Sequence, residues 1–411
     1  MKNVGLVSLS AYLPGTPISK ELKDKLVAFL HGTKIPKDYI TDIEQNSALP
    51  GYIEDNYMGW ESKPWYNAWL KSLPNKKQGD PFQGSKERRR VPMDPISIKE
   101  SVVPHPMKPS DAEVIAGSLA LVKWGKPKEE IDLVLTHSQV QDFPLPTNTS
   151  LVQDKLGLVN AGAYSVDSCC SSFVTLVEVA TALVKSGIKK NVLIVNSILD
   201  SHINDKTDYY SVNTGDAATS AVVSAVEEGC GYFGSESSSH GALHDGIVFH
   251  RRQPSLFKGM SAGPSHQQDF VTFYNPESTR AIGATALENL KDVVDKLYAK
   301  GDIKQNNTNF LITHQPVAWA PNYWREGLGF SSDQFYSSFE KYGNVATCCV
   351  PVNLMEAIEN DLIKDKDMVL LASSGAGENH IALLQKVSPE LIKNVKKYSL
   401  NNINKLEFQL N

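Results

Sequence analysis

The sequence predicts an α/β fold, because apolar strand-like runs alternate with amphipathic helical patterns over most of its length. Residues 111–125 and 149–156 have helical periodicity, and the run 131–136 between them is almost entirely apolar. A short apolar run of this kind is typical of a strand that is buried on both faces. Strand and helix alternating at this spacing indicate right-handed βαβ units, so we expect a mostly parallel sheet covered by helices on both faces.

The other elements follow in chain order. The N-terminal run 4–11 is broken by Ser and Gly, which favours a buried first strand over a signal peptide. Ser19 is a suitable N-cap for a helix that ends near Leu30. The remaining expected elements are a strand from 163 that leads through a tight turn into a helix over 171–187, strands at 191–196, 309–313, 368–372 and 381–384, and helices over 279–297 and 353–360.

Residues 37–84 interrupt this pattern. They contain Trp60, Trp65 and Trp69 together with frequent Pro, Gly and Asn, and they lack a clear period. We interpret them as an inserted subdomain. It is either a surface elaboration with its own aromatic cluster or a lid over a substrate entrance.

Composition bounds the class of protein. The chain has 411 residues, of which 41% are hydrophobic and 21% charged, as in ordinary globular proteins. The net charge of −5 argues against a nucleic-acid-binding protein. Two basic clusters, 86–90 and 250–252, are either solvated loops or contacts for a phosphate-bearing carrier such as coenzyme A or a phosphopantetheinyl protein. No run approaches the about eighteen apolar residues of a membrane span, so no membrane partner is expected.

Cysteine usage indicates a reducing compartment. Four of the five cysteines form the adjacent pairs Cys169-Cys170 and Cys348-Cys349. Neighbouring cysteines rarely bridge each other, and the pairs lack the Cys-x-x-Cys spacing of zinc sites. We therefore expect no disulfide framework, no metal site and a cytoplasmic protein.

Cys170 stands where an enzyme would place a nucleophile. It ends the run 163–170, which reads as a strand and a tight turn, and the helical pattern follows directly. The first turn of a helix has unpaired N–H groups and partial positive charge. A thiol at this position is expected to shift toward thiolate, the form that attacks carbonyl groups.

Three further features could complete a site around this thiol. His314 follows a buried strand, and the carboxyl ends of such strands carry ligand sites in α/β folds. Asn344 follows Gly343, which allows a tight backbone. The glycine loop 375–377 also follows a buried strand, so its N–H groups could face a ligand oxygen. Each of these features taken alone is also found in ordinary structural positions.

Together, in this order along the chain, these features resemble the ketoacyl-ACP synthase III branch of the thiolase superfamily, the condensing enzymes that start fatty-acid and polyketide chains. The family's elbow has a cysteine followed three residues later by Phe, as Cys170 and Phe173 are, which selects Cys170 over Cys169 as the nucleophile. Its His-Gln after a strand is matched by His314-Gln315. The other matches are the Gly-Asn segment 343–351, the loop 375–377, the Gly-Asp turn 215–218 and the loop 136–144, which ends in Phe-Pro.

The resemblance implies a thiolase-like fold, in which two similar βαβ halves form a layered α-β-α-β-α core. The first half would span 1–226, with the cysteine and the insertion at 37–84, and the second would span 227–411, with the histidine and asparagine. It also implies a homodimer in which Phe143 of one subunit reaches into the pocket of the other.

The resemblance also implies a reaction. An acyl thioester, carried by coenzyme A or acyl carrier protein, would acylate Cys170, with the N–H groups of Cys170 and Gly377 as the oxyanion hole. His314 and Asn344 would then bind a malonyl-type thioester while it loses carbon dioxide. The resulting enolate would attack the acyl group and give a 3-oxoacyl product, with no metal or redox cofactor.

The chain departs from the family pattern at two places. Pro316 to Trp319 replace Ala-Asn and a basic residue, and Glu378-Asn379-His380 replace hydrophobic and aromatic residues. We therefore expect a specialised relative, with Phe143, Trp319 and His380 shaping its substrate pocket.

Two alternatives to the condensing reaction remain open. The first is acyl transfer without decarboxylation to an alcohol, amine or other small acceptor, with His314 as general base. The second is a catalytically silent subunit of a heterodimeric condensing enzyme. The retained Asn344 favours carbon–carbon bond formation over simple acyl transfer, and the intact Cys170, His314 and Asn344 argue against a silent subunit.

Overall fold

The computed structural model describes residues 2–54, 87–93, 106–203, 213–251, 270–273, 275–301 and 303–399. Most of the predicted insertion at 37–84, including Trp60, Trp65 and Trp69, lies outside the described residues, as does Arg252 of the second basic cluster. Among the described residues, none of the helices has the length and apolar character needed to cross a membrane.

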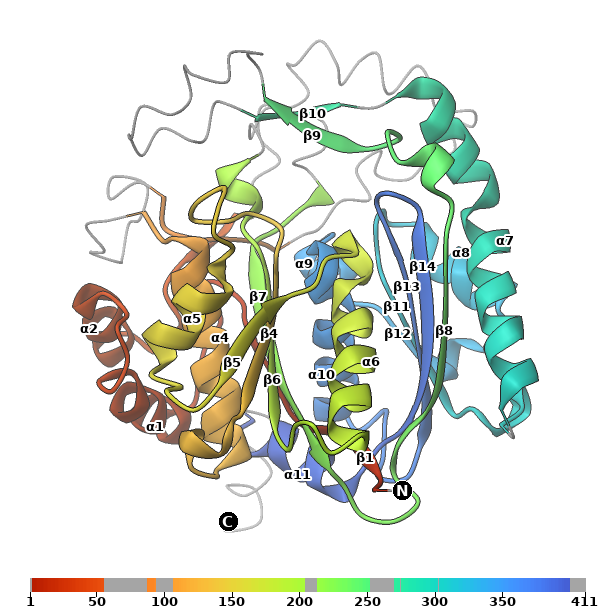
Figure 1. The fold of residues 1–411 in the computed structure, drawn as a ribbon. Helices are drawn as coiled ribbons and strands as arrows, with labels where there is room; N and C mark the ends of the chain where they lie inside the picture. The colour runs from red at the N-terminus through yellow and green to blue at the C-terminus, as the bar shows by residue number, and fades with distance from the viewer. Residues whose placement is uncertain are drawn as a thin grey trace, which may run out of the picture.

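Two five-stranded sheets form the framework of the described chain (Figure 1). The strands of the first, in spatial order, are β1 (Val4–Tyr12), β7 (Ala217–Ala225), β6 (Val192–Ile198), β4 (Leu133–Ser138) and β5 (Gly162–Ser165). The strands of the second are β12 (Phe335–Tyr336), β11 (Phe310–Thr313), β13 (Met368–Gly375), β14 (Asn379–Lys386) and β8 (Gly231–Ser239). The first sheet thus comes from the chain up to Ala225, and the second from Gly231 onward.

Both sheets are mixed, so the expectation of mostly parallel pairing is wrong. In the first sheet β4 is parallel to β5 and β6, whereas β7 is antiparallel to both β6 and β1. In the second, β11 is parallel to β12 and β13, whereas β14 is antiparallel to β13 and β8. The connection from β13 to β14 is only three residues long, and such a short loop can join only antiparallel neighbours.

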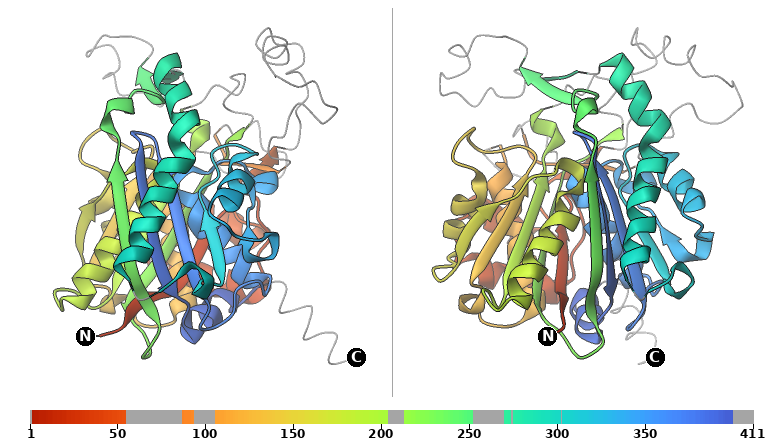
Figure 2. Two further views of the ribbon diagram at one scale, coloured as in Figure 1. Left: turned by 90° about the vertical axis from the view of Figure 1, so that its right-hand side faces the viewer. Right: turned by 45° about the vertical axis from the view of Figure 1, so that its right-hand side comes forward.

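Helices form three layers around the two sheets, as the views in Figures 1 and 2 show. α6 (Ser172–Lys185) and α10 (Cys349–Glu359) lie between the sheets, and their apolar side chains share one core with strands of both. The outer face of the first sheet is covered mainly by α4 (Pro109–Trp124), and that of the second by α7 (Pro276–Lys300). This confirms the predicted α-β-α-β-α layering.

The smaller elements complete these layers. α1 (Lys20–Leu30) begins at its predicted cap, because the Ser19 hydroxyl accepts a hydrogen bond from the N–H of Leu22. The other described helices and strands are α2 (Lys37–Gln45), α5 (Asn148–Leu156), α8 (Ala320–Gly327), α9 (Phe339–Tyr342), α11 (Pro389–Lys396), β2 (Tyr52–Glu54), β3 (Arg88–Arg90), β9 (Val248–Arg251) and β10 (Phe270–Phe273).

The arginines of the first basic cluster are not in a solvated loop, so neither interpretation of Arg88–Arg90 was right. They form the buried strand β3, which pairs with β2. Arg90 contacts the carboxylates of Asp200 at 3.1 Å and Glu54 at 3.0 Å. Buried charges of this kind must be paired, and these partners neutralise the guanidinium inside the fold.

Each central helix begins with a similar turn. The 3₁₀ turn Cys169–Ser171 leads into α6, and the 3₁₀ turn Ala346–Cys348 leads into α10. The first residue of each turn has positive φ, +54° for Cys169 and +45° for Ala346. The N–H of Phe173 donates to the Thr347 hydroxyl at 3.0 Å, so the two turns lie against each other.

Candidate active site

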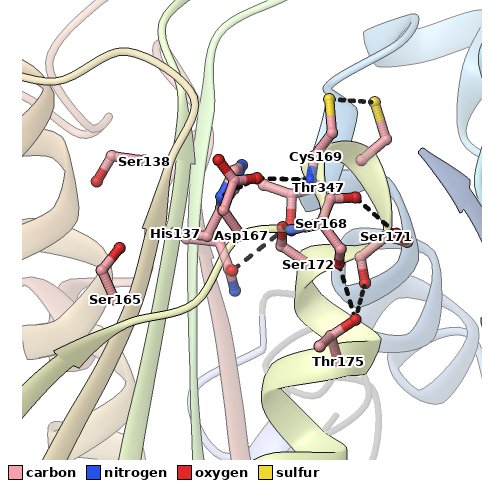
Figure 3. Close-up of polar contacts among 12 residues, drawn as sticks. His137, Ser138, Ser165, Asp167, Ser168, Cys169, Ser171, Ser172, Thr175 and Thr347 are labelled. Carbon is pink, nitrogen blue, oxygen red and sulfur yellow. Dashed lines mark hydrogen bonds and ion pairs between the residues drawn. The ribbon is translucent and has the colours of Figure 1, made fainter. Parts of the chain in front are cut away.

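Cys170 lies in the tight turn between β5 and α6, as the sequence predicts. The turn is held from within: the Ser171 hydroxyl donates to the Ser168 carbonyl at 2.6 Å, and the Ser168 N–H donates to the Ser172 hydroxyl at 2.8 Å. These bonds, drawn in Figure 3, fix the backbone of the elbow. The cysteine is therefore presented by a rigid turn at the start of a central helix.

Cys169 and Cys170 form a close pair of thiols. Their Sγ atoms are 3.8 Å apart, which is within reach of a sulfur hydrogen bond. The hydrogen bond with the Cys170 thiol lowers the pKa of Cys169. The same contact raises the pKa of Cys170 well above its usual value, and burial raises it further. The sequence predicts a thiol shifted toward thiolate at the helix start, whereas the contact with Cys169 and burial both raise the pKa of Cys170.

Asp167 connects the elbow to a buried histidine. Its Oδ1 accepts a hydrogen bond from the N–H of Cys169 at 2.7 Å and lies 3.3 Å from Nδ1 of His137 (Figure 3). Burial lowers the pKa of His137, and the Asp167 carboxylate opposes that change. The Asp167 contact holds the Cys169 backbone in its left-handed conformation.

The glycine loop after β13 packs directly on the elbow. A Cβ atom on Gly375 would overlap the Ser168 carbonyl oxygen, so no side chain fits there. The Ser373 hydroxyl donates to the Cys170 carbonyl at 3.2 Å. The Ala376 backbone N–H interacts with the thiols of both Cys169 and Cys170 and favours their ionised forms. Ala376 therefore supplies a backbone donor beside the sulfur, one residue before the predicted donor Gly377.

His314 lies immediately after β11 and is buried. Burial lowers its pKa to about 3, although the backbone carbonyl of Ala346 favours the protonated ring. Its ring packs against Trp324, with the ring centroids 6.4 Å apart. Nδ1 has no hydrogen-bond partner among the described residues. His314 is therefore a neutral imidazole at ordinary pH, with capacity to bind another group.

The side chain of Asn344 is oriented by its own turn. Its Oδ1 accepts hydrogen bonds from the N–H of Ala346 at 2.8 Å and from the Cys349 thiol at 3.6 Å. Its Nδ2 donates to the Pro316 carbonyl at 3.3 Å. This arrangement fixes which end of the amide is the donor, because both acceptor contacts fall on the oxygen.

The Gly-Asp turn of the sequence supports Asn344. The backbone N–H of Asn344 donates to the Asn213 carbonyl at 2.6 Å, and Thr214 forms a parallel bridge with Asn344. A Cβ atom on Gly215 would lie 2.7 Å from the Tyr342 carbonyl oxygen. Glycine at this position therefore allows the first half of the chain to hold the asparagine of the second.

The structure brings the three predicted catalytic residues into one region. Cys170 packs against the hydrophobic cluster that contains Val345, Ala346 and Cys349. Cys349 contacts Asn344 and also acts electrostatically on Cys170, and Ala346 contacts both Asn344 and His314. A thiol, a neutral imidazole and a carboxamide are thus joined through one short segment.

The predicted pocket residues lie in different environments. Phe143 is 55% exposed, and Trp319 is 57% exposed with its ring against Tyr323 at a centroid distance of 5.8 Å. His380 is buried and forms a hydrogen bond with Ser374. Their roles in substrate binding stay predictions.

Sequence reasoning missed three residues at this site. Cys169 was passed over in favour of its neighbour, although an adjacent thiol is itself a signal. Asp167, two residues before Cys169, has the spacing of a side chain that caps the following backbone. Ala376 carries no signal of its own, because its role depends on the direction that the β13–β14 hairpin gives its backbone N–H.

Comparisons with known proteins agree with this geometry. Family models described as 3-oxoacyl-[acyl-carrier-protein (ACP)] synthase III and as its C-terminal part match residues 164–241 and 298–387. The beta-ketoacyl-[acyl-carrier-protein] synthase III of a Sulfurovum species is 30% identical over 274 residues, which cover 65% of this chain and 78% of the relative. The chain belongs to the ketoacyl-ACP synthase III family. The predicted catalytic residues of this synthase III relative, Cys170, His314 and Asn344, all fall within the matched segments.

Solved structures agree on the fold. The beta-ketoacyl-[acyl carrier protein] synthase III of Thermus thermophilus superposes with a TM-score of 0.65 at 22% identity, covering 93% of this chain and 98% of that one. OleA of Xanthomonas campestris superposes with a TM-score of 0.65 at 16% identity, covering 94% and 98%. The ketoacyl-ACP synthase III family and the thiolase fold predicted from the sequence are thus confirmed.

Proposed function

We propose that this synthase III relative forms an acyl-Cys170 intermediate and condenses it, with loss of carbon dioxide, with a malonyl-type thioester to give a 3-oxoacyl product. The observation that carries the proposal is the grouping of neutral His314 and oriented Asn344 around Ala346, beside the elbow of Cys170. Two neutral donors suit an enolate, because a carboxylate in their place would repel its charge.

Acylation begins at the thiol pair. The Cys170 sulfur bonds to the thioester carbon, the carbon–sulfur bond of the thioester breaks, and the proton of the Cys170 thiol passes to the leaving thiolate, while the Cys169 sulfur lies 3.8 Å away. The tetrahedral oxyanion is then held by the N–H groups of Cys170 and Ala376. Ala376 takes the place that the sequence assigned to Gly377, the next residue. A single oxyanion donor contributes about 3 kcal/mol to transition-state stability in other enzymes.

Condensation uses the second half of the site. The Asn344 amide nitrogen donates to the Pro316 carbonyl at a long 3.3 Å, and the neutral His314 ring contacts the same segment at Ala346. Both groups donate to the thioester oxygen as carbon dioxide leaves, and the enolate carbon attacks the acyl carbonyl. The new carbon–carbon bond replaces the carbon–sulfur bond, and the Cys170 sulfur is released.

The carriers, partners and location remain predictions of this proposal. Acyl-CoA or acyl carrier protein would deliver the acyl group, no metal or redox cofactor would take part, and the chain would act as a cytoplasmic homodimer in specialised fatty-acid or polyketide metabolism.

A carbon dioxide assay combined with intact-mass analysis tests the proposal. The purified chain is incubated with an acyl-CoA series and with malonyl-CoA labelled in its free carboxyl. We expect an acyl adduct that Cys170→Ala abolishes, followed by release of labelled carbon dioxide. Acyl transfer to an added alcohol or amine without carbon dioxide would support the alternative acyltransferase. Absence of any adduct with every acyl-CoA would support a silent subunit.

A further inference from the structure

A second group of reactive side chains lies behind the glycine loop. Ser374 and His380 face each other across the β13–β14 pair, and the Ser374 hydroxyl is 2.9 Å from Nδ1 of His380. Their neighbours two residues away, Ala372 and Ala382, pack in the core beneath α7, whereas Ser373 contacts Cys170. The Ser374–His380 contact is therefore on the face of the sheet that points away from the elbow.

Glu378 completes this group. Its Oε1 lies 3.4 Å from Nε2 of His380, and the two side chains are 4% and 0% exposed. Neither atom has a hydrogen-bond partner among the described residues. Glu378 also has φ of +54°, which is strained for a residue with a side chain. A buried carboxylate is costly unless it is paired, so its only compensation within this group is the imidazole.

The three side chains follow the order of an activated nucleophile, with a hydrogen bond between Ser374 and His380 and an ion-pair distance of 3.4 Å, without a hydrogen bond, between His380 and Glu378. A hydroxyl within hydrogen-bond reach of an imidazole, which is oriented in turn by a carboxylate, is the recurring signature of nucleophilic catalysis. Here Ser374 is partly exposed, whereas His380 and Glu378 are buried. The hydroxyl that would meet a substrate is partly accessible to solvent, and the groups that would activate it are buried.

We propose that Ser374, His380 and Glu378 form a second, serine-based acyl-transfer site that accepts acyl thioesters. The choice of thioester as the substrate rests on the proposed function, because the same loop carries the Ala376 amide beside Cys170. The site itself rests on the geometry of the three side chains and needs no reaction at Cys170.

The reaction balances with these groups and water. The Ser374 proton passes to Nδ1 of His380 as Oγ bonds to the thioester carbon, and Glu378 stabilises the imidazolium. The carbon–sulfur bond then breaks, and the leaving thiolate takes the proton from Nδ1. Water attacks the acyl-serine with His380 as base, the carbon–oxygen bond breaks, and a free carboxylic acid leaves Ser374 with its proton restored.

The test uses a Cys170→Ala chain and a fluorophosphonate, a probe that phosphonylates activated serines and releases fluoride. We expect one phosphonyl adduct, mapped by mass spectrometry to Ser374 and absent from the added Ser374→Ala variant. The matched control is Ser239→Ala, which removes a hydroxyl of the same sheet that bonds Asn379 instead of an imidazole, and it should keep the adduct. His380→Gln should slow labelling about 100-fold or more, the scale of general-base catalysis.

Two outcomes would overturn the site. One is the absence of any adduct on Ser374, and the other is a labelling rate that His380→Gln leaves unchanged. Thermal melting of each variant shows whether it is folded, and Glu378→Gln gives a second, milder variant in which slower labelling is again expected. Acyl adducts on Cys170 are measured separately in the native chain, so failure at Ser374 leaves the condensing proposal untouched.

Discussion

The sulfur atoms of Cys169 and Cys170 lie 3.8 Å apart at the start of α6, and the pKa of the predicted nucleophile depends on this neighbour. Cys169 has a left-handed backbone conformation, and its N–H donates a hydrogen bond to Oδ1 of Asp167. The pair thus has one acidic sulfur and one sulfur that keeps its proton until a substrate arrives.

Replacing Cys169 should make Cys170 more acidic. The hydrogen bond between the thiols is the largest cause of the raised pKa of Cys170, so Cys169→Ala should shift the midpoint of Cys170 alkylation to lower pH. The measurement is the rate of iodoacetamide alkylation against pH, followed on the peptide that contains Cys170. Cys230→Ala, which removes a remote thiol, is the control. An unchanged or higher midpoint would show that Cys169 does not control this thiol.

Because of His314, the free energy of unfolding should decrease as the pH falls. Its pKa is about 3 in the folded chain and about 6.5 when unfolded, so the unfolded chain gains a proton below pH 6.5 that the folded chain refuses. Its contribution is complete above pH 6.5 and falls by about 1.4 kcal/mol per pH unit as the pH drops toward 3. His314→Gln removes this dependence.

Urea midpoints at pH 7.5 and 5.5 measure the effect of His314. The native chain should lose more stability between these values than His314→Gln does, by about 1.4 kcal/mol. Glu113, whose pKa burial raises to about 7, is present in both chains and cancels in the comparison. Parallel losses in the two chains would mean that the buried ring is not the acid-sensitive group.

Asn344→Ala should separate the two stages of the reaction. In the proposed reaction acylation takes place at the elbow, so it should be nearly unchanged, whereas condensation should fall about 100-fold or more because one proposed enolate donor is lost. Adduct formation is read by intact mass and condensation by carbon dioxide release. A full condensing rate in this variant would remove Asn344 from the proposed mechanism.

Gly375→Ala should disrupt the contact between the glycine loop and the elbow. The added Cβ would overlap the Ser168 carbonyl oxygen, so the Ala376 amide would move away from the thiols. We expect a lower melting temperature and at least about tenfold slower acylation, a loss in the range of one oxyanion donor. Gly283→Ala in α7 is the matched control, because nothing lies within 4 Å of its added Cβ. Equal behaviour of the two variants would contradict the role of this contact.

The edge strand β5 should form a two-fold dimer. It ends the first sheet, and Tyr164 on it is 52% exposed; Phe143 and Leu145, in the segment before α5, are also exposed. An open strand edge with exposed apolar side chains is a template for pairing with another chain. Light scattering should give twice the mass of one chain for the native protein. Tyr164→Asp should lower the measured mass toward that of a single chain. A monomeric native chain would contradict the dimer.

Sequence patterns predicted the framework well because the strands are buried on both faces. The runs around Ile131 and Val192 are apolar for this reason, and the helix over 171–187 was found from its period. The prediction was wrong at Arg88–Arg90, because these charged residues form a buried strand. Their partners Glu54 and Asp200 are far away in the sequence, so the pairing could not be seen in it.

The sequence predicted which residues form the candidate site, but it did not predict the backbone donor or the pKa values of the two thiols. The order of Cys170, His314 and Asn344 along the chain was sufficient to select them. The Ala376 donor and the acidity of Cys169 could not be derived, because each depends on a backbone direction set by a turn. A one-residue shift along the β13–β14 loop points a different amide at the sulfur.

The most direct test of the central claim follows one acyl group through the site. Chain loaded with acyl groups on Cys170 is mixed with malonyl-CoA labelled in its free carboxyl, and the adduct and the released carbon dioxide are counted together. The account predicts one labelled carbon dioxide for each adduct consumed, with a 3-oxoacyl product. Decay of the adduct without labelled carbon dioxide would contradict it.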